Sequence, residues 1–538
     1  MIKIAILLAL FILQSIVGES QDWIRIFSDP TRGIAPEQIR ESYDGGYLLA
    51  TNLIWSGWER IGQMNKLDIN GNIIWTKSFG NGGVKWHIHG FDQTPDRGLI
   101  ISGVCDTLDP AWQDAFVIKL NACMEPVWCK IFHLGEGADY AQKIISLQDN
   151  TSIVLFHKIS LSPFDITVWL FHLDASGEMI WKQEYLKNDS LSYPDTENAL
   201  YLTADNKYLI TGTCYSTIFG QTDPKWPWPM LILADSSGDG VFEIPWGYKL
   251  PFPEMVFGEG FQSVQLNAEV FSCISDYHYP VNFYTPCLIK TDLTGNPISY
   301  HDLIQNTVFG KAHTITKFPD SILFIGVGYS LDTATFYLSV EKTDTIGNIL
   351  NNKIVSNSSY GPIDAIRSID NKYLITTMDK INNKFITYLW KLNYDLEYDT
   401  IYNQPRRYDS LCPDTIISGT IFPDCDVVVD VRGSMTKEHC SLHAYPNPAH
   451  TKVHIDLPDC IIKETKTTHF TVTSTIYQWH KDLWLQAYDP MGRMVYQQMV
   501  KPGEKEVTLN VSTWSRGMYY LRLVYGDTMV ASEKIIID

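Results

Sequence analysis

Short runs of alternating or continuous apolar residues, each ended by a turn, follow one another along most of the chain. One pattern, an apolar strand followed by a Lys-Leu-Asp-like turn, occurs seven times, most clearly in residues 66–75 (KLDINGNIIW). Repeats of about 50 residues are typical of propellers and solenoids. The copies begin at Lys66, Lys119, His172, Leu233, Lys290, Lys342 and Lys391, with successive spacings of 53, 53, 61, 57, 52 and 49 residues.

A second pattern precedes the first in several copies and reads as a turn that leads into a buried strand. Asp, Asn and Gly tolerate the backbone of tight turns, and the Tyr, Leu and Ile that follow suit a covered sheet. Asn70-Gly71 between apolar runs is a strong hairpin signal. This second pattern begins at Asp44, Asp96, Asp205 and Asp370.

About four short strands per repeat, without a sustained helical period, predict an all-β fold in which each repeat is one propeller blade. Seven copies predict a seven-bladed β-propeller over residues 21–402. The strand after each hairpin, usually aromatic, appears eight times, from Trp23–Phe27 to Asp399–Tyr402. The surplus copy is expected to be either an edge strand or the piece that closes the ring, because an open ring would expose sheet edges.

Composition narrows the possible partners. The chain of 538 residues is 45% hydrophobic and carries a formal net charge of −19. This charge argues against nucleic acid and anionic lipid as partners, since both require basic patches. Lys3 and the apolar run 4–17, with small residues at 18–20, predict a signal peptide over residues 1–20 and an exported protein without a membrane span.

Ten cysteines in an exported chain allow five disulfides, and sequence alone does not pair them. Two local pairs are the simplest hypotheses. Cys123 and Cys129 flank one hairpin, and Cys412 and Cys425 punctuate the Pro-containing stretch after the repeats. That stretch, residues 403–440, is expected to be a linker.

The last hundred residues differ in character from the repeats. They contain four motifs in order, AYPNP at 444–448, AYDPMGRMV at 487–495, WSRGMYYLRL at 514–523 and KIII at 534–537. These residues resemble the type A C-terminal sorting domain of the type IX secretion system of Bacteroidota, over residues 441–538. An insertion, residues 459–481, is longer than the family's usual strand connection. The motif residues are Pro446, Asn447, Pro448, Gly492, Gly517, Tyr519 and Lys534.

The resemblance implies a small β-sandwich that carries its cargo across the outer membrane and has the type IX machinery as a partner. The protein is then secreted or attached to the outer cell surface. The blades are similar to repeats of secreted propellers from the same bacteria, and more distantly to quinoprotein repeats. A shared fold of this kind does not carry a function.

Two stretches suggest metal chemistry. His87 and His89 place two imidazoles on one side of a strand, but the spacing implies no third ligand, so an ordinary strand is the simpler interpretation. Residues 235–240 (DSSGDG) resemble a calcium loop but stand where the other repeats have a plain turn. The sequence therefore predicts no metal and no cofactor.

Catalytic residues cannot be named from the sequence, because acids occur in nearly every turn and no nucleophile or phosphate-loop motif is present. Trp226 and Trp228 alternate with prolines, which predicts a loop over one face of the ring. Their rings either pack within that loop or form a sugar-stacking, ligand-binding platform. The leading hypothesis is a recognition module for a glycan or a protein. The alternatives are a polysaccharide-acting enzyme with acids at the propeller centre, and a structural surface protein.

Overall fold

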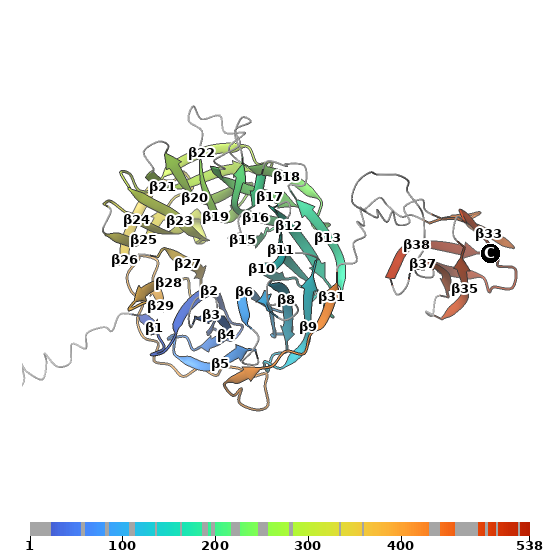
Figure 1. Ribbon diagram of the computed structural model, residues 1–538, viewed down its shortest axis with the longest axis horizontal. Helices are drawn as coiled ribbons and strands as arrows, with labels where there is room; N and C mark the ends of the chain where they lie inside the picture. The colour runs from blue at the N-terminus through green and yellow to red at the C-terminus, as the bar shows by residue number, and fades with distance from the viewer. Residues whose placement is uncertain are drawn as a thin grey trace, which may run out of the picture. The chain divides into compact units, whose positions relative to one another are not determined.

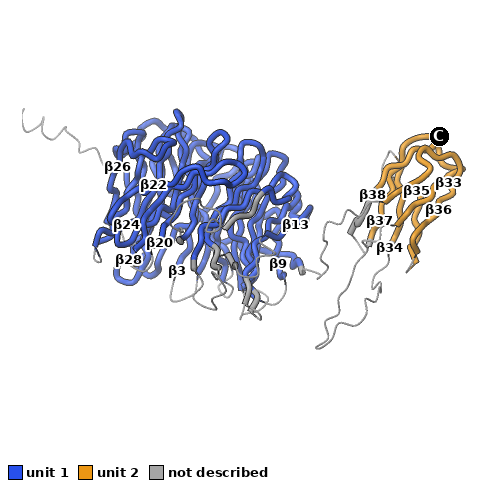
Figure 2. Tube along the Cα trace, turned by 90° about the horizontal axis from the view of Figure 1, so that it is seen from above, with its two compact units in different colours: residues 1–429 blue, residues 430–538 orange. Residues whose placement is uncertain are grey.

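The computed structural model divides the chain into two compact units, residues 1–429 and 430–538 (Figure 2). Among the described residues, no helix is long and apolar enough to cross a membrane. The expected signal peptide, Gly492 and the insertion 459–481 lie outside them. The described residues are 23–54, 60–80, 85–106, 113–134, 137–161, 164–185, 192–194, 199–216, 226–245, 257–278, 283–332, 335–357, 360–429, 442–457, 483–489, 493–501, 504–525 and 528–538.

Unit 1 is a propeller-like ring of antiparallel sheets, most of them four-stranded (Figure 1). In each sheet the strands follow one another in chain order, except in the sheet that the N-terminal strand completes. We call the strand of each sheet that contacts its counterparts in the neighbouring sheets the inner strand. Middle strands such as residues 99–105 and 114–120 are buried along their whole length instead of on alternate residues, as expected for strands that adjacent sheets cover on both faces.

The first three sheets comprise β2 (Gly33–Glu41), β3 (Tyr47–Ile54), β4 (Arg60–Leu67) and β5 (Ile73–Phe79); β6 (Trp86–Gln93), β7 (Leu99–Cys105), β8 (Asp114–Leu120) and β9 (Pro126–His133); and β10 (Ala138–Ser146), β11 (Ser152–Leu161), β12 (Phe164–Leu173) and β13 (Met179–Tyr185). A parallel contact between β4 and β6 joins the first two sheets into one larger sheet.

The next three comprise β14 (Ser192–Pro194), β15 (Ala199–Leu202), β16 (Tyr208–Ser216), β17 (Trp226–Ala234) and β18 (Gly240–Pro245); β19 (Phe257–Leu266), β20 (Glu269–His278), β21 (Phe283–Asp292) and β22 (Pro297–Asp302); and β23 (Phe309–Lys317), β24 (Leu323–Ser330), β25 (Phe336–Thr343) and β26 (Ile349–Ser356), with the short 3-10 helix η2 (Pro319–Ser321) after β23.

The N-terminal strand completes the last sheet. β27 (Pro362–Arg367), β28 (Tyr373–Ile381) and β29 (Lys384–Leu392) supply three strands, and β1 (Ile24–Phe27) pairs antiparallel with β29. The surplus strand of the sequence is therefore β1, which joins the two ends of the ring. The last expected copy, Asp399–Tyr402, forms no strand, because β1 occupies the place beside β29.

In four sheets of the described ring the two repeated motifs meet in an ion pair. There the lysine that precedes the hairpin turn reaches an acidic residue at or just before the second strand. Lys66 lies 1% exposed, with its Nζ 2.6 Å from Asp44 Oδ1. Equivalent pairs join Lys119 to Asp96 at 2.7 Å, Lys290 to Glu269 at 2.7 Å and Lys391 to Asp370 at 3.2 Å.

The glycine and the aromatic of the hairpin motif serve contacts between neighbouring sheets. A Cβ built on Gly177 would lie 2.8 Å from the ring of Trp128, and one on Gly238 would lie 2.6 Å from Trp181. Both glycines also have positive φ, at 82° and 85°. Glycine is therefore required twice over, by the turn and by the close approach of the preceding sheet's tryptophan.

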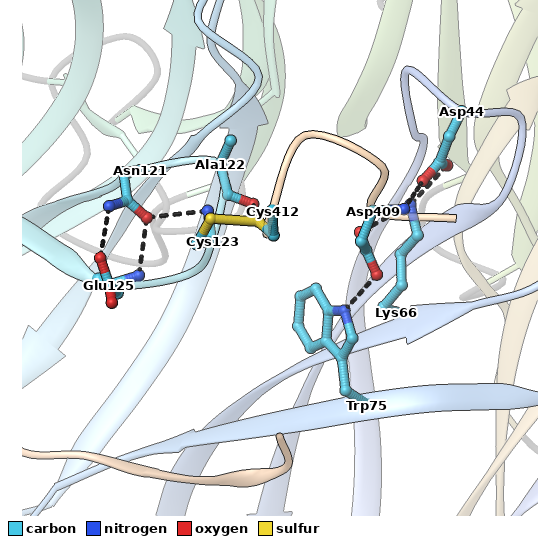
Figure 3. Close-up of a disulfide and its surroundings, with 9 residues drawn as sticks. All are labelled: Asp44, Lys66, Trp75, Asn121, Ala122, Cys123, Glu125, Asp409 and Cys412. Atoms are coloured by element: carbon cyan, nitrogen blue, oxygen red, sulfur yellow. Dashed lines mark hydrogen bonds and ion pairs between the residues drawn. A yellow bond between two sulfur atoms is a disulfide. The ribbon is translucent and has the colours of Figure 1, made fainter. Parts of the chain in front are cut away.

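Residues 403–429, which the sequence assigns to a linker, are part of unit 1. We call them the strap. Its strands β30 (Gly419–Ile421) and β31 (Asp426–Val429) pair in parallel with the outer strands β5 and β9. Asp409 of the strap also accepts a hydrogen bond from Trp75 Nε1 at 2.9 Å (Figure 3).

The expected local disulfides are wrong. Cys123 is bonded to Cys412, as Figure 3 shows, and Cys129 to Cys425, across separations of 289 and 296 residues. Both bonds fasten the strap to the second sheet. Cys129 lies on β9 and Cys123 in the turn before it, so each finds its partner on the chain that runs alongside rather than in its own hairpin.

Unit 2 contains two sheets around one apolar core. One is formed by β32 (His443–Tyr445), β33 (Lys452–Asp456) and β36 (Glu506–Asn510); the other by β34 (Leu483–Tyr488), β35 (Met494–Val500), β37 (Gly517–Tyr525) and β38 (Thr528–Ile537). Residues of both sheets, including Ile455, Leu509 and Leu521, share a single buried cluster.

Candidate functional site

The inner strands of the ring share an irregularity that positions polar side chains. Most of them carry a β-bulge, in which an extra residue opposes the second strand. Bulges re-aim side chains and are common beside functional sites. The extra residues are Glu37 on β2, His89 on β6, Gln142 on β10, Phe261 and Gln262 on β19, His313 on β23 and Ile363 on β27.

Two of these bulges form the candidate site. Glu37 and His89, with His87, each offer one ligand atom, and these atoms all lie within 4.8 Å of one another. His87 Nε2 is 3.1 Å from Glu37 Oε1, and the two imidazole rings are 4.2 Å apart at their centroids. Asn52 also donates to Glu37 Oε1 at 2.8 Å, which fixes the carboxylate.

Cations surround this cluster. Arg60 Nη1 lies 3.3 Å from His87 Nε2, and Lys143 Nζ donates to the carbonyl of His89 at 2.9 Å. Burial works to raise the pKa of Glu37, but the hydrogen bond from His87 and the charge of Lys143 outweigh it, so that pKa is lowered. Burial, with His87 and Lys143 acting in the same direction, holds the pKa of His89 well below its usual range.

The cluster therefore presents one ionised carboxylate, neutral His89 and two cations. Its donors match a zinc-type ligand set, but Arg60 and Lys143 oppose the approach of another cation. Nε2 of His89 is buried and has no hydrogen-bond partner among the described residues. A buried polar atom without a partner is costly, which marks this nitrogen as a place for a ligand group.

The tryptophan platform does not have the expected form. Trp226 and Trp228 lie in strand β17, paired with β16, and not in a loop. Among the described residues β18 pairs with β17 as far as Met230, and both prolines lie beyond that point. Trp228 is 2% exposed and packs in the core, so its ring cannot stack on a ligand at the surface. The side chain of Trp226 lies outside the described residues.

The sequence identified His87 and His89 but missed Glu37, which comes from the preceding sheet. Glu37 and His89 occupy the same bulge position in adjacent repeats. Aligning the repeats with one another would therefore have placed both residues on inner strands. The calcium-like stretch 235–240 forms the hairpin turn, with Asp235 Oδ1 accepting from the amides of Ser237 and Asp239.

The sorting-motif residues hold unit 2 together. Asn447 donates to the carbonyl of Lys534 at 2.9 Å and accepts from the amide of Ile536 at 2.8 Å, tying the first motif to the last. Tyr519 is 5% exposed, and its hydroxyl donates to the carbonyl of Ser515. Pro446 and Pro448 flank Asn447, and Gly517 begins β37.

Comparison with known families agrees. Residues 443–538 match the family described as Secretion system C-terminal sorting domain. The chain thus carries a type IX sorting domain, which implies contact with that secretion machinery. The protein is exported and is secreted or attached to the outer cell surface. No curated relative matches the sequence.

Solved structures similar to the chain have diverse descriptions. Prolyl oligopeptidase B from Galerina marginata is 10% identical, with a TM-score of 0.41, over 70% of this chain and 50% of its own. The β-propeller domain of the Trilobed protease from Pyrococcus furiosus is 10% identical, with a TM-score of 0.38, over 69% and 99%. A glucose dehydrogenase is 12% identical, with a TM-score of 0.33, over 57% and 98%. At these scores the likenesses carry no argument about function.

Proposed function

We propose that unit 1 is a seven-bladed β-propeller that recognises a glycan at the cluster of Glu37, His87, His89 and Arg60. The observation that carries this proposal is the convergence of Glu37, His87 and His89 from the adjacent inner strands β2 and β6, with Arg60 of β4 beside His87. His89 Nε2 is left without a protein partner in the described part of the chain. Recognition then takes place on a protein delivered to the cell exterior by its sorting domain.

The wider architecture supports this proposal. The lysine-turn motif occurs seven times, and β1 joins the last sheet to the start of the ring. The two sheets of unit 2 share one core, as in a small β-sandwich. We further infer that residues 1–20 are a signal peptide and that the protein comes from a member of the Bacteroidota, the group in which this sorting domain is used.

The charges favour a sugar that bears a carboxylate. Arg60 and Lys143 supply positive charge beside a single carboxylate, so an acidic group is attracted more than a cation. Glu37 can accept hydrogen bonds from hydroxyls, and His89 offers the ring nitrogen Nε2, which has no partner among the described residues. This combination suits a ligand that is hydroxylated and acidic at once.

An enzyme acting on polysaccharide is less well supported. Glycoside hydrolysis usually needs two carboxyl groups, one of them held protonated as the acid. The described part of the cluster contributes one carboxylate, Glu37, and its pKa is lowered rather than raised. If no glycan binds, the alternatives are a propeller that binds a protein and one with a purely structural role.

The test is a glycan array that includes neutral, uronic-acid and sulfated sugars, probed with the purified exported chain. Glu37→Gln and His89→Ala should each weaken binding of the best acidic glycan at least about tenfold, because each removes a polar contact to the ligand. Glu259→Gln is the matched control, since Glu259 pairs with Lys311 on inner strands β19 and β23 instead. Equal binding by all three variants would place the site elsewhere, and silence across the array would reject glycan recognition.

A further inference from the structure

A second cluster of ligand-type side chains lies where the second and third sheets meet. Asp114 begins β8, His133 ends β9, and Asp139 lies at the start of β10. Each offers one ligand atom, and the three atoms lie within 4.8 Å of one another. This cluster shares no residue with the cluster of Glu37, His87 and His89.

In each of the two aspartates, one carboxylate oxygen makes a hydrogen bond, and the other has no partner among the described residues. Asp114 Oδ1 lies 2.8 Å from His133 Nδ1, and Asp139 Oδ2 accepts from the amide of Leu134 at 2.7 Å. Asp114 Oδ2 and Asp139 Oδ1 are buried with no hydrogen-bond partner in the described part of the chain. The two residues are 1% and 0% exposed, so neither oxygen can turn to bulk solvent.

Such an arrangement is costly unless something positive fills it. Buried carboxylates are normally paired, hydrogen-bonded or bound to metal. Burial raises the pKa of Asp139 to about 7, and the neighbouring charge of Asp114 acts in the same direction. Lys158 is the nearby cation acting on Asp139, but its ammonium group donates to the carbonyl of Leu134 rather than to either free oxygen.

We propose that Asp114, His133 and Asp139 form a binding site for one divalent cation of the zinc or manganese type. Two carboxylate oxygens and one imidazole nitrogen are the ligand set such ions take. A cation there would satisfy both orphan oxygens and link the second sheet to the third through Asp139. Unlike the Glu37 cluster, this site has no arginine in contact with its histidine among the interactions of the described residues.

The experiment measures metal bound to the whole exported chain after chelation and dialysis against Zn²⁺, Mn²⁺ or Ca²⁺ in separate arms. The expected result is about one Zn²⁺ or Mn²⁺ per chain, with a raised melting temperature. Asp139→Asn should weaken that binding at least about tenfold, because the amide oxygen is a neutral and poorer ligand.

Two further variants keep the proposal open to refutation. His133→Ala changes the most exposed of the three side chains, 34% accessible, so it tests the site if Asp139→Asn does not fold. Glu37→Gln should leave the stoichiometry unchanged. Loss of the ion in Glu37→Gln but not in His133→Ala would overturn the proposal. No uptake of any of the three metals would also overturn it, and a proton shared by the buried carboxylates would then take the place of the ion.

Discussion

At the scale of single residues, the buried histidines are the groups of the ring most sensitive to acid. His157 on β11 is fully buried, and desolvation lowers its pKa to about 3. His313, the bulge residue of β23, has its pKa lowered to about 3 by burial and by the charge of Lys311. Both side chains are therefore neutral in the folded ring throughout the mildly acidic range.

This predicts a loss of stability on acidification. Below the ordinary histidine pKa of 6.5, the unfolded chain binds a proton that folded His157 does not bind until about pH 3. The stabilising contribution is therefore complete above pH 6.5 and falls as the pH falls, by about 2 kcal/mol at pH 5. Urea unfolding at pH 7 and pH 5 should show a smaller difference for His157→Gln than for the unmodified chain. An identical difference in both would contradict the assignment.

At the scale of elements, an ion pair joins the two repeated motifs in four of the described sheets. Lys66 lies beside Asp44, whose side chain is 5% exposed, and also contacts Ser42. Burial raises the pKa of Asp44, but Lys66 outweighs it and that pKa is lowered. Burial also lowers the pKa of Lys66, and Asp44 opposes this lowering, so each charge is stabilised by the other. The pair joins the turn to the hairpin at one end of the strands.

Removing one partner of this pair should lower the free energy of unfolding substantially, because the other charge stays buried without its counter-ion. Lys66→Met is expected to destabilise the ring by about 3–5 kcal/mol. The double variant Lys66→Met with Asp44→Asn should recover part of that loss. The matched control is Lys85→Met at the more exposed pair with Asp106, which should cost no more than about 1 kcal/mol. Equal costs for Lys66 and Lys85, measured by chemical denaturation, would show that burial of the pair does not matter.

At the scale of the whole molecule, the strap decides where the ring unit ends. It covers the outer edges of β5 and β9 and is held by both disulfides. Exposed strand edges are sites of aggregation, so covering them protects the ring. The covalent bonds also restrict the unfolded chain, which typically contributes about 2–4 kcal/mol for each disulfide.

Two truncations test this boundary. A chain of residues 21–429 should be monomeric and stable, whereas one of residues 21–402 lacks Cys412 and Cys425 and should aggregate or unfold at lower urea. Size-exclusion chromatography with light scattering and urea unfolding would compare them. Reduction of the longer chain should reproduce part of the difference. If both chains are equally stable and monomeric, the strap is a passive linker.

Much of this architecture could be predicted from local signals. The lysine-turn copies mark the hairpins, Asn70-Gly71 has the expected turn, and Trp23–Phe27 supplies the closing strand. The expected tryptophan loop was wrong because proline was taken to exclude a strand, whereas residues 226–234 form β17 and pair with β16. Glu37 was missed because it comes from the preceding sheet, one repeat before His89.

The sequence by itself determined the repeat, the all-β character and the C-terminal motifs, because hydrophobic period and turn chemistry act over a few residues. Only the tertiary structure decided what joins distant parts of the chain. The disulfides connect Cys123 to Cys412 and Cys129 to Cys425, and the bulges bring Glu37 to His89. The packing of the second sheet against the third brings Asp114 and His133 to Asp139. These contacts depend on the packing of adjacent sheets and on the course of the strap, which no local pattern encodes.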